Sequence, residues 1–166
     1  MTVLAGSEPL ASIGVAKVHV LHPGDVAVGR RGDRLETLLG SCVAIILTDP
    51  RRTVGAMCHI VHSGDAARQP TTGNAHAAPA LRSMFTLLEK QGIAPTLCEA
   101  YVYGGGNMFP TVFSHTHVGQ RNSEWALQAL MRHGIHLVDQ DVGGATYRRL
   151  SWTVGSEAPR IDAVAV

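Results

Sequence analysis

The chain has 166 residues, a length that fits one domain better than two. Hydrophobic residues make up 45% of it, enough for a sizeable core, and charged residues make up only 16%. The formal net charge of +1 gives no electrostatic case for nucleic acid as a partner, because phosphate binding needs clustered Lys and Arg. No apolar run approaches the ~20 residues of a membrane-spanning helix, and the N-terminus lacks the pattern of a signal peptide. We therefore expect a cytoplasmic protein that is not embedded in a membrane.

The first residues differ in character from the rest of the chain. Residues 1–16 are small and mixed, which predicts a flexible leader before a single domain over residues 17–166. Apolar and polar positions alternate from Lys17 to Leu21, as in a strand. The turn signal His22-Pro23-Gly24-Asp25 follows, and Val26 to Val28 is predicted to pair back onto the first strand.

Two later segments predict a hairpin. The β-branched, apolar run from about Cys42 to Thr48 is typical of a buried strand. A turn at residues 49–52 separates it from Thr53 to Val61, which reads as the return strand. This hairpin is expected to bring His59 beside the segment that carries Cys42.

The second half alternates between helix and strand patterns. Apolar residues at helical spacing predict a first helix, which Gly92 ends, with a buried stripe of Leu81, Met84, Phe85 and Leu88. A strand is expected from Leu97 to Tyr103. A second helix is predicted to begin at Asn122 or Ser123, to end at Gly134, and to bury Leu127, Leu130 and Met131. With a further strand at Ile135 to Val138, the order of elements predicts one mixed α+β domain.

The three cysteines form no CxxC pair, which is typical of reduced thiols. A thiol hydrolase needs a nucleophile, a base, a group that orients the base, and donors for the developing oxyanion. The run Gly40-Ser41-Cys42 offers the thiol and nearby N–H donors, His59 is the candidate base, and Thr37 is the candidate orienting hydroxyl. Such a Cys–His pair is expected to lower the thiol pKa.

The same three residues also have structural readings. A cysteine in an apolar strand is usually an inert core residue, and a histidine there can be a satisfied core side chain. A threonine hydroxyl often bonds to its own backbone. From the residues alone, the catalytic and the structural interpretations of these three residues both stay open.

Two other groupings carry weaker signals. One grouping suggests a zinc site and consists of Cys58, His59 and His62, with His115 and His117. Against it, adjacent residues of a strand, such as Cys58 and His59, point to opposite faces, and the spacing matches no standard zinc finger. Gly104-Gly105-Gly106 lacks the Lys of a phosphate-binding loop, which favours a tight turn or a close backbone approach beside a site.

Five short motifs, in order, resemble the signature of the CheD family, the chemoreceptor glutamine deamidases of bacterial chemotaxis. They are Thr37 to Ala44, Gly55 to His59, Gly104-Gly105 with Met108-Phe109, Gly119 to Asn122, and Asp141 to Gly144. The resemblance spans roughly Val18 to Arg148. Some family members carry the threonine six residues before the cysteine, where Glu36 stands here; in this chain Thr37 is five before.

The resemblance implies a mixed β-sandwich flanked by helices, similar to bacterial toxin-type glutamine deamidases. It implies a catalytic Cys42, His59 and Thr37, with Ser41, Gly40, Gly105, Arg121 and Asn122 around the substrate or the oxyanion. It implies hydrolysis of receptor glutamines to glutamates through a thioester, without a metal or an organic cofactor. Partners would be methyl-accepting chemotaxis receptors and, in some bacteria, a CheC-type phosphatase.

Three alternatives remain at this point. The chain could be a non-enzymatic regulator that binds receptors or the phosphatase. It could be another thiol acyl-transfer enzyme, such as a peptidase or a transglutaminase-like protein. It could also be a metal-binding module.

Overall fold

The computed structural model describes residues 14–64, 73–113 and 116–166, so most of the expected leader lies outside the described residues. The expected mixed α+β domain is confirmed. Its elements are β1 (Val18–Leu21), β2 (Val26–Arg30), β3 (Arg34–Leu39), β4 (Val43–Thr48), β5 (Val54–Ile60), α1 (Ala77–Lys90), the 3₁₀ turn η2 (Pro95–Leu97), β6 (Glu99–Gly104), α2 (Val118–Arg132), β7 (His136–Val142), β8 (Thr146–Thr153) and β9 (Arg160–Ala165). None of the described helices is long and apolar enough to cross a membrane.

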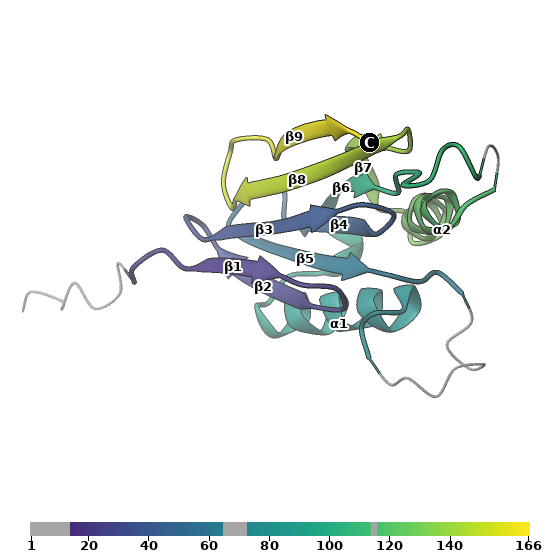
Figure 1. Ribbon diagram of the computed structural model, residues 1–166. Coiled ribbons are helices and arrows are strands. Elements are labelled where there is room, and N and C mark those ends of the chain that lie inside the picture. The colour runs from purple at the N-terminus through teal and green to yellow at the C-terminus, as the bar shows by residue number, and fades with distance from the viewer. Residues whose placement is uncertain (1–13, 65–72, 114–115) are drawn as a thin grey trace, which may run out of the picture.

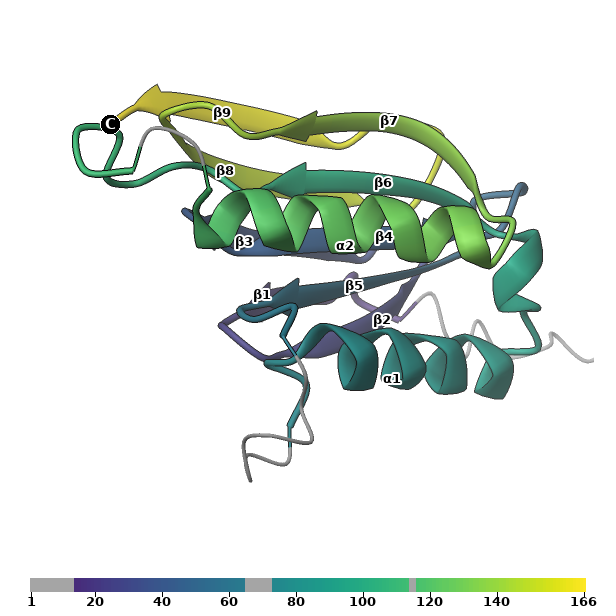
Figure 2. The same ribbon diagram turned by 90° about the vertical axis from the view of Figure 1, so that its right-hand side faces the viewer.

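The strands form two sheets that pack face to face. Sheet A has the order β1-β3-β8-β9, and sheet B has the order β2-β5-β4-β6-β7. Both helices cover the outer face of sheet B, α1 over β2 and β5 and α2 over β6 and β4 (Figures 1 and 2). The layers therefore run sheet A, sheet B, helices, which is the expected β-sandwich with flanking helices.

Two apolar clusters fill the spaces between these layers. The first lies between the sheets and includes Leu35, Leu39, Ala44, Ile46, Met57 and Trp152. The second lies between sheet B and the helices and includes Val43, Ile45, Leu47, Met84, Leu88 and Leu130. Strands β4 and β5 are buried on both faces, because each face of sheet B is covered.

The predicted pairing of the first two strands is wrong. β1 pairs in parallel with β3 in sheet A, whereas β2 pairs antiparallel with β5 in sheet B. The turn at residues 22–25 is therefore a crossing between the sheets. The segment before Cys42 is also a strand, β3, for which the sequence predicted no separate element.

The β4–β5 hairpin is confirmed, with Ala44 directly opposite His59. The first helix is confirmed as well: it buries Leu81, Met84 and Leu88, and Gly92 follows its C-cap with a φ of 77°.

The second helix begins four residues earlier than the predicted Asn122. Its N-cap is His117, whose Nδ1 accepts a hydrogen bond from the Gln120 N–H. Asn122 and Ser123 are buried inside the first turns and bind other partners, so neither caps the helix. Met131, predicted to be buried, is 78% exposed.

Candidate active site

Cys42 and His59 share one face of sheet B. The ladder between β4 and β5 pairs Ala44 with His59, and Cys42 stands two positions before Ala44. Alternation along a strand therefore places the Cys42 and His59 side chains diagonally on the same face, which is the face toward sheet A. Cys42 is half-buried and packs at the edge of the inter-sheet cluster, whereas His59 is 2% exposed.

Thr37 reaches His59 from the opposite sheet. It lies on β3 of sheet A, and its Oγ1 is 2.7 Å from His59 Nδ1. The same hydroxyl donates its only hydrogen to the Leu21 carbonyl oxygen at 2.7 Å. Oγ1 must therefore accept from His59, so that Nδ1 carries the ring hydrogen and Nε2 keeps its lone pair.

The free nitrogen of His59 lies inside the protein. Nε2 is buried and has no hydrogen-bond partner among the described residues, Cys42 included. A buried imidazole nitrogen with an open lone pair is available to take a proton from a neighbouring group.

The turn between β1 and β2 covers the backbone of His59. The His59 N–H donates to the Asp25 carbonyl at 3.0 Å, and the Gly24 N–H donates to the His59 carbonyl at 3.0 Å. Gly24 has a φ of 87°, and a Cβ at this position would lie 3.3 Å from the backbone nitrogen of Ala75. The turn thus fixes the strand that carries the histidine.

Burial disfavours the charged forms of both side chains, the Cys42 thiolate and the His59 imidazolium. Burial lowers the pKa of His59 to about 4, an effect opposed by the Asp25 carboxylate and reinforced by His22. Burial also raises the pKa of the Cys42 thiol. The expectation of a lowered thiol pKa is therefore wrong for this structure, because desolvation penalises the charged thiolate.

The backbone around Cys42 is anchored by the glycine triplet, Gly104 to Gly106. The Gly105 N–H donates to the Cys42 carbonyl at 2.8 Å, and the Gly106 N–H donates to the Gly40 carbonyl at 2.9 Å. A Cβ on Gly104 would lie 2.2 Å from the Cys42 carbonyl oxygen, so only glycine permits this approach. The predicted role of the triplet as a close backbone approach fits these contacts, and the Gly105 N–H is bound to the protein itself.

The helix residues expected near the substrate differ in placement. Asn122 is 1% exposed, and its Nδ2 donates to the Ser41 carbonyl at 3.1 Å and to the Val61 carbonyl at 3.0 Å. Arg121 is exposed on the same helix and, with Ser41, lines a pocket of about 250 Å³. Asn122 thus holds the backbone around the site, whereas Arg121 lies on the surface of the site.

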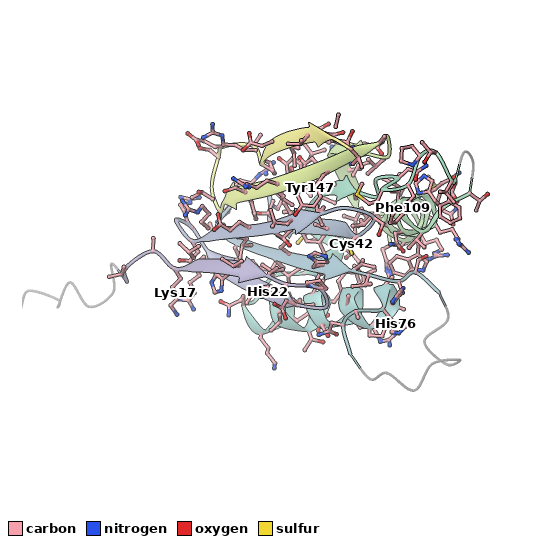
Figure 3. The ribbon with its side chains drawn as sticks, in the orientation of Figure 1. Lys17, His22, Cys42, His76, Phe109 and Tyr147 are labelled. Atoms are coloured by element: carbon pink, nitrogen blue, oxygen red, sulfur yellow. The ribbon has the colours of Figure 1, made fainter. Side chains whose placement is uncertain are left out.

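Exposed apolar side chains surround this pocket. We call Phe109, Val112, Phe113 and Val118 the apolar rim; all four are exposed. Three of them line the pocket beside Ser41. Cys42 lies at the end of the molecule where Phe109 and Tyr147 also stand (Figure 3). The turn that carries Ser41 and Cys42 is therefore bordered by exposed apolar side chains.

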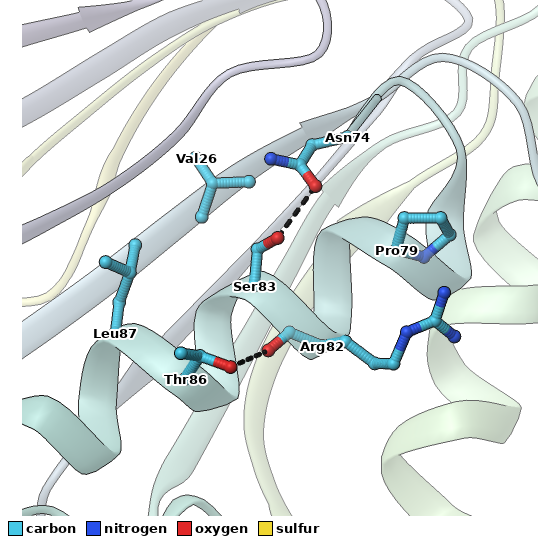
Figure 4. Close-up of a pocket in the computed structure, with 7 residues that line it drawn as sticks. All are labelled: Val26, Asn74, Pro79, Arg82, Ser83, Thr86 and Leu87. Carbon is cyan, nitrogen blue, oxygen red and sulfur yellow. Dashed lines mark hydrogen bonds between the residues drawn. The ribbon is translucent and has the colours of Figure 1, made fainter. Parts of the chain in front are cut away.

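A second pocket lies on the other face of sheet B, between β2 and α1 (Figure 4). Its two lining hydroxyls are engaged: Ser83 donates to Asn74 Oδ1 at 2.8 Å, and Thr86 donates to the Arg82 carbonyl at 3.1 Å. Arg82 is the charged residue in the lining. Sheet B separates this pocket from Cys42, which packs on the face toward sheet A.

Comparisons with known proteins identify the family of this chain. The sequence model described as CheD chemotactic sensory transduction matches residues 62–160, more than half of the chain. The chain belongs to the CheD family. The matched residues include the glycine triplet and Asn122, whereas Thr37, Cys42 and His59 precede them, so the roles of these three are argued from geometry.

Several curated relatives are similar over most of their length. Probable chemoreceptor glutamine deamidase CheD 2 of Albidiferax ferrireducens is 36% identical over 140 residues, which cover 82% of this chain and 81% of that protein. Probable chemoreceptor glutamine deamidase CheD of Pseudomonas savastanoi pv. phaseolicola is 35% identical, covering 83% and 79%. The protein of the same name from Methanococcus maripaludis is 29% identical, covering 77% and 83%.

The zinc alternative finds no support among the described residues of this CheD-family chain. No group of three or more His, Cys, Asp and Glu side chains gathers there; His115 lies outside that part. Cys58 is fully buried beneath the helices, and burial raises the pKa of its thiol to about 12.

Arg148 is the residue of this site that sequence reasoning missed. It is 3% exposed on β8, and its guanidinium donates to the Gly104 carbonyl at 3.2 Å, the Gly143 carbonyl at 2.8 Å and Asp141 Oδ1 at 3.1 Å. It thereby ties the glycine triplet to the Asp141 to Gly144 motif. The available signal was a basic residue in step with the apolar positions Leu150 and Trp152 of an alternating strand.

Proposed function

We propose that this chain hydrolyses the side-chain carboxamide of specific glutamines on chemotaxis receptors to carboxylate, with Cys42 as nucleophile and His59 as base. The observation that carries the proposal is the open Nε2 of His59, oriented through Thr37 and placed on the face that carries Cys42, in a member of the CheD family. The reaction needs no metal and no organic cofactor, because thiol, imidazole and water supply every group that reacts.

The chemistry begins with a proton transfer. His59 Nε2 takes the thiol proton as the sulfur of Cys42 attacks the carboxamide carbon, forming the S–C bond and moving the carbonyl electron pair onto oxygen. Backbone N–H groups near Cys42 stabilise this oxyanion; one such donor is typically worth ~3 kcal/mol. The protonated imidazole then gives its proton to the departing nitrogen, and ammonia leaves.

Hydrolysis of the thioester completes the cycle. Neutral His59 takes a proton from water, the resulting hydroxide adds to the acyl carbon, and the C–S bond breaks as the protonated imidazole returns its proton to the departing sulfur. The products are glutamate and the Cys42 thiol. A neutral resting pair suits this sequence, since the charges form only once substrate has displaced water from the site.

The apolar rim supports a protein substrate. Four exposed apolar side chains beside a reactive thiol match the surface of an amphipathic receptor helix, whose glutamine would enter while its apolar face contacts the rim. Because the substrate is the cytoplasmic part of a receptor, the proposal places the protein in the cytoplasm. Arg121 and Ser41, which line the same pocket, are the proposed substrate contacts.

The same rim favours a second candidate role. An exposed apolar surface can also bind a regulator, so the chain would act through a CheC-type phosphatase with or without catalysis. Phosphatase stimulation by a Cys42→Ala protein separates the two roles, since binding does not need the sulfur.

The decisive experiment uses receptor cytoplasmic fragments and mass spectrometry. Wild-type protein is expected to release ammonia and to convert individual glutamines to glutamates without cutting the chain. Cys42→Ala should abolish both signals, whereas Cys58→Ala, which removes a buried thiol of high pKa, should retain them if it folds. Full activity in the Cys42→Ala protein would overturn the mechanism, and peptide cleavage would point to a peptidase.

A further inference from the structure

Three consecutive carbonyl groups before β4 are all bound by the protein. The carbonyls of Gly40 and Cys42 accept from the N–H groups of Gly106 and Gly105. The carbonyl between them, that of Ser41, accepts from Asn122 Nδ2 at 3.1 Å. The turn that presents Cys42 is therefore held through its carbonyl oxygens. Two of the three donors are backbone N–H groups, and the third is the side chain of Asn122.

Asn122 also binds the strand that carries His59. Its second amide hydrogen goes to the carbonyl of Val61, two residues after His59, at 3.0 Å. The last paired residues of the β4–β5 ladder are Val43 and Ile60, so Asn122 bridges the two strands where their own pairing stops. Both amide hydrogens are used, which fixes the orientation of the side chain.

The Ser41 contact determines where the next N–H group points. The described chain contains no cis peptide bond, so the Ser41 carbonyl and the Cys42 N–H of the same peptide point in opposite directions. With the carbonyl bound to Asn122 on α2, the Cys42 N–H points away from that helix. Among the described residues no acceptor is bound to this N–H. The thiol also packs on the face of sheet B opposite α2.

We infer that Asn122 is a positioning residue: by holding the Ser41 carbonyl, it presents the Cys42 N–H as the donor to the oxyanion that forms on the substrate carboxamide. The inference rests on the proposed function and adds the residue that aims the donor. Asn122 itself does not touch the substrate, since it is buried and both amide hydrogens bind the backbone.

The test separates attack on a carbonyl from reactivity of the sulfur. Asn122→Asp keeps the shape but replaces the donor by an acceptor, and Asn122→Ala removes it. Deamidation of a receptor fragment is measured beside alkylation of Cys42 by iodoacetamide, a displacement that forms no oxyanion. We expect kcat to fall roughly 10²- to 10³-fold, with KM and the alkylation rate within about twofold of wild type.

Gln120→Ala is the matched control. Gln120 is exposed on the same helix, and its side chain donates to Glu124 at 3.1 Å, so its loss should leave both rates unchanged. A parallel fall in deamidation and alkylation in the Asn122 variants would overturn the inference, because Asn122 would then merely hold the thiol and the imidazole. An unchanged kcat would overturn it as well.

A measurement on the wild-type protein avoids any folding defect of the variants. A receptor peptide whose glutamine carboxamide is replaced by an aldehyde should form a hemithioacetal with Cys42. The amide proton of Cys42 should then move downfield in the NMR spectrum more than those of its neighbours. An unmoved Cys42 amide in the formed adduct would contradict the inference. A wild-type protein that deamidates no receptor fragment would instead contradict the proposed function.

Discussion

Thr37 shows how one hydroxyl can determine the tautomer of a buried imidazole. Because its hydrogen is committed to the Leu21 carbonyl, the hydroxyl can only accept from His59, and the lone pair of the imidazole is left on Nε2. Leu21 lies on β1, Thr37 on β3 and His59 on β5, so the tautomer depends on three strands from two sheets.

The first prediction concerns this hydroxyl. Thr37→Val keeps the shape but removes both hydrogen bonds, and we expect kcat to fall roughly 10²-fold because the imidazole loses its orientation. The free energy of unfolding should fall by about 1–3 kcal/mol, since a buried N–H and a carbonyl lose their partner. Thr37→Ser retains the hydroxyl and should recover most of the activity. Equal activity of the Val and Ser variants would show that the hydroxyl does not orient the base.

The second prediction concerns His59 and pH. Its pKa is lowered from 6.5 to about 4 in the folded protein, so between these values the unfolded chain binds more protons than the folded one. Stability contributed by the neutral imidazole is therefore lost as pH falls through this window, in total about 3 kcal/mol. Urea denaturation at pH 7 and pH 4 measures this: the free energy of unfolding should fall further between the two pH values in the wild type than in His59→Gln. An equal loss in both proteins would contradict it.

At the scale of elements, the first turn of α2 depends on a close backbone contact. A Cβ on Gly119 would lie 2.5 Å from the carbonyl oxygens of both Gly105 and Gly106. This contact brings the helix to the glycine triplet and allows Asn122, one turn later, to reach the Ser41 carbonyl. The position of the helix is thus part of the construction of the site.

The third prediction follows from this contact. Replacing glycine by alanine in a helix normally stabilises it by about 0.5–1 kcal/mol, but Gly119→Ala should destabilise the protein by about 1–3 kcal/mol because α2 must move away. Gly64→Ala, where a Cβ meets nothing within 4 Å, is the control and should change stability little. Urea denaturation measures both. A stabilised Gly119→Ala protein would show that the helix is not held by this approach.

Local patterns predicted the elements that depend on neighbours in the sequence. The β4–β5 hairpin, the stripe of α1 and the glycine after it came from periodicity and turn residues, and the hairpin alone placed His59 near Cys42. The parallel pairing of β1 with β3 was not predictable, because it is set by the packing of two sheets. The start of α2 was missed since Asn122, a good N-cap residue in isolation, binds backbone carbonyls from two other segments.

The same division applies to the candidate site. Cys42, His59 and Thr37 were named from motifs, and their placement on facing sheets required the tertiary structure. The direction of the pKa shift of Cys42 was predicted wrongly, because burial between the sheets was not visible in the sequence. Arg148 carried no motif, and its three acceptors lie at the end of β6, in β7 and in the turn after β7, which only the fold brings together.

At the scale of the whole molecule, the site forms where the two sheets and α2 converge at one end of the sandwich (Figures 1 and 3). Arg148 joins the layers there. Arg148 lies on β8 of sheet A. It donates to the Gly104 carbonyl at the end of β6 and to the Gly143 carbonyl just after β7, and β6 and β7 are strands of sheet B. The Gly104 carbonyl and the Gly105 N–H belong to one peptide, so the guanidinium also fixes the group that donates to the Cys42 carbonyl.

The fourth prediction concerns these contacts of Arg148. Arg148→Met preserves length and apolar volume but leaves the Gly143 carbonyl without its donor. Removing a buried guanidinium also relieves its desolvation, and Asp141 is half-exposed and can be hydrated. We therefore expect a modest net loss of about 1–2 kcal/mol in the free energy of unfolding, together with faster hydrogen exchange of the Gly105 amide and reduced deamidation. Arg149→Met is the matched control, because Arg149 is the next residue of β8 and is exposed on its other face. If both variants left Gly105 exchange unchanged, the two sheets would be held at this end by the apolar cluster alone, and Arg148 would have no part in fixing the backbone of Cys42.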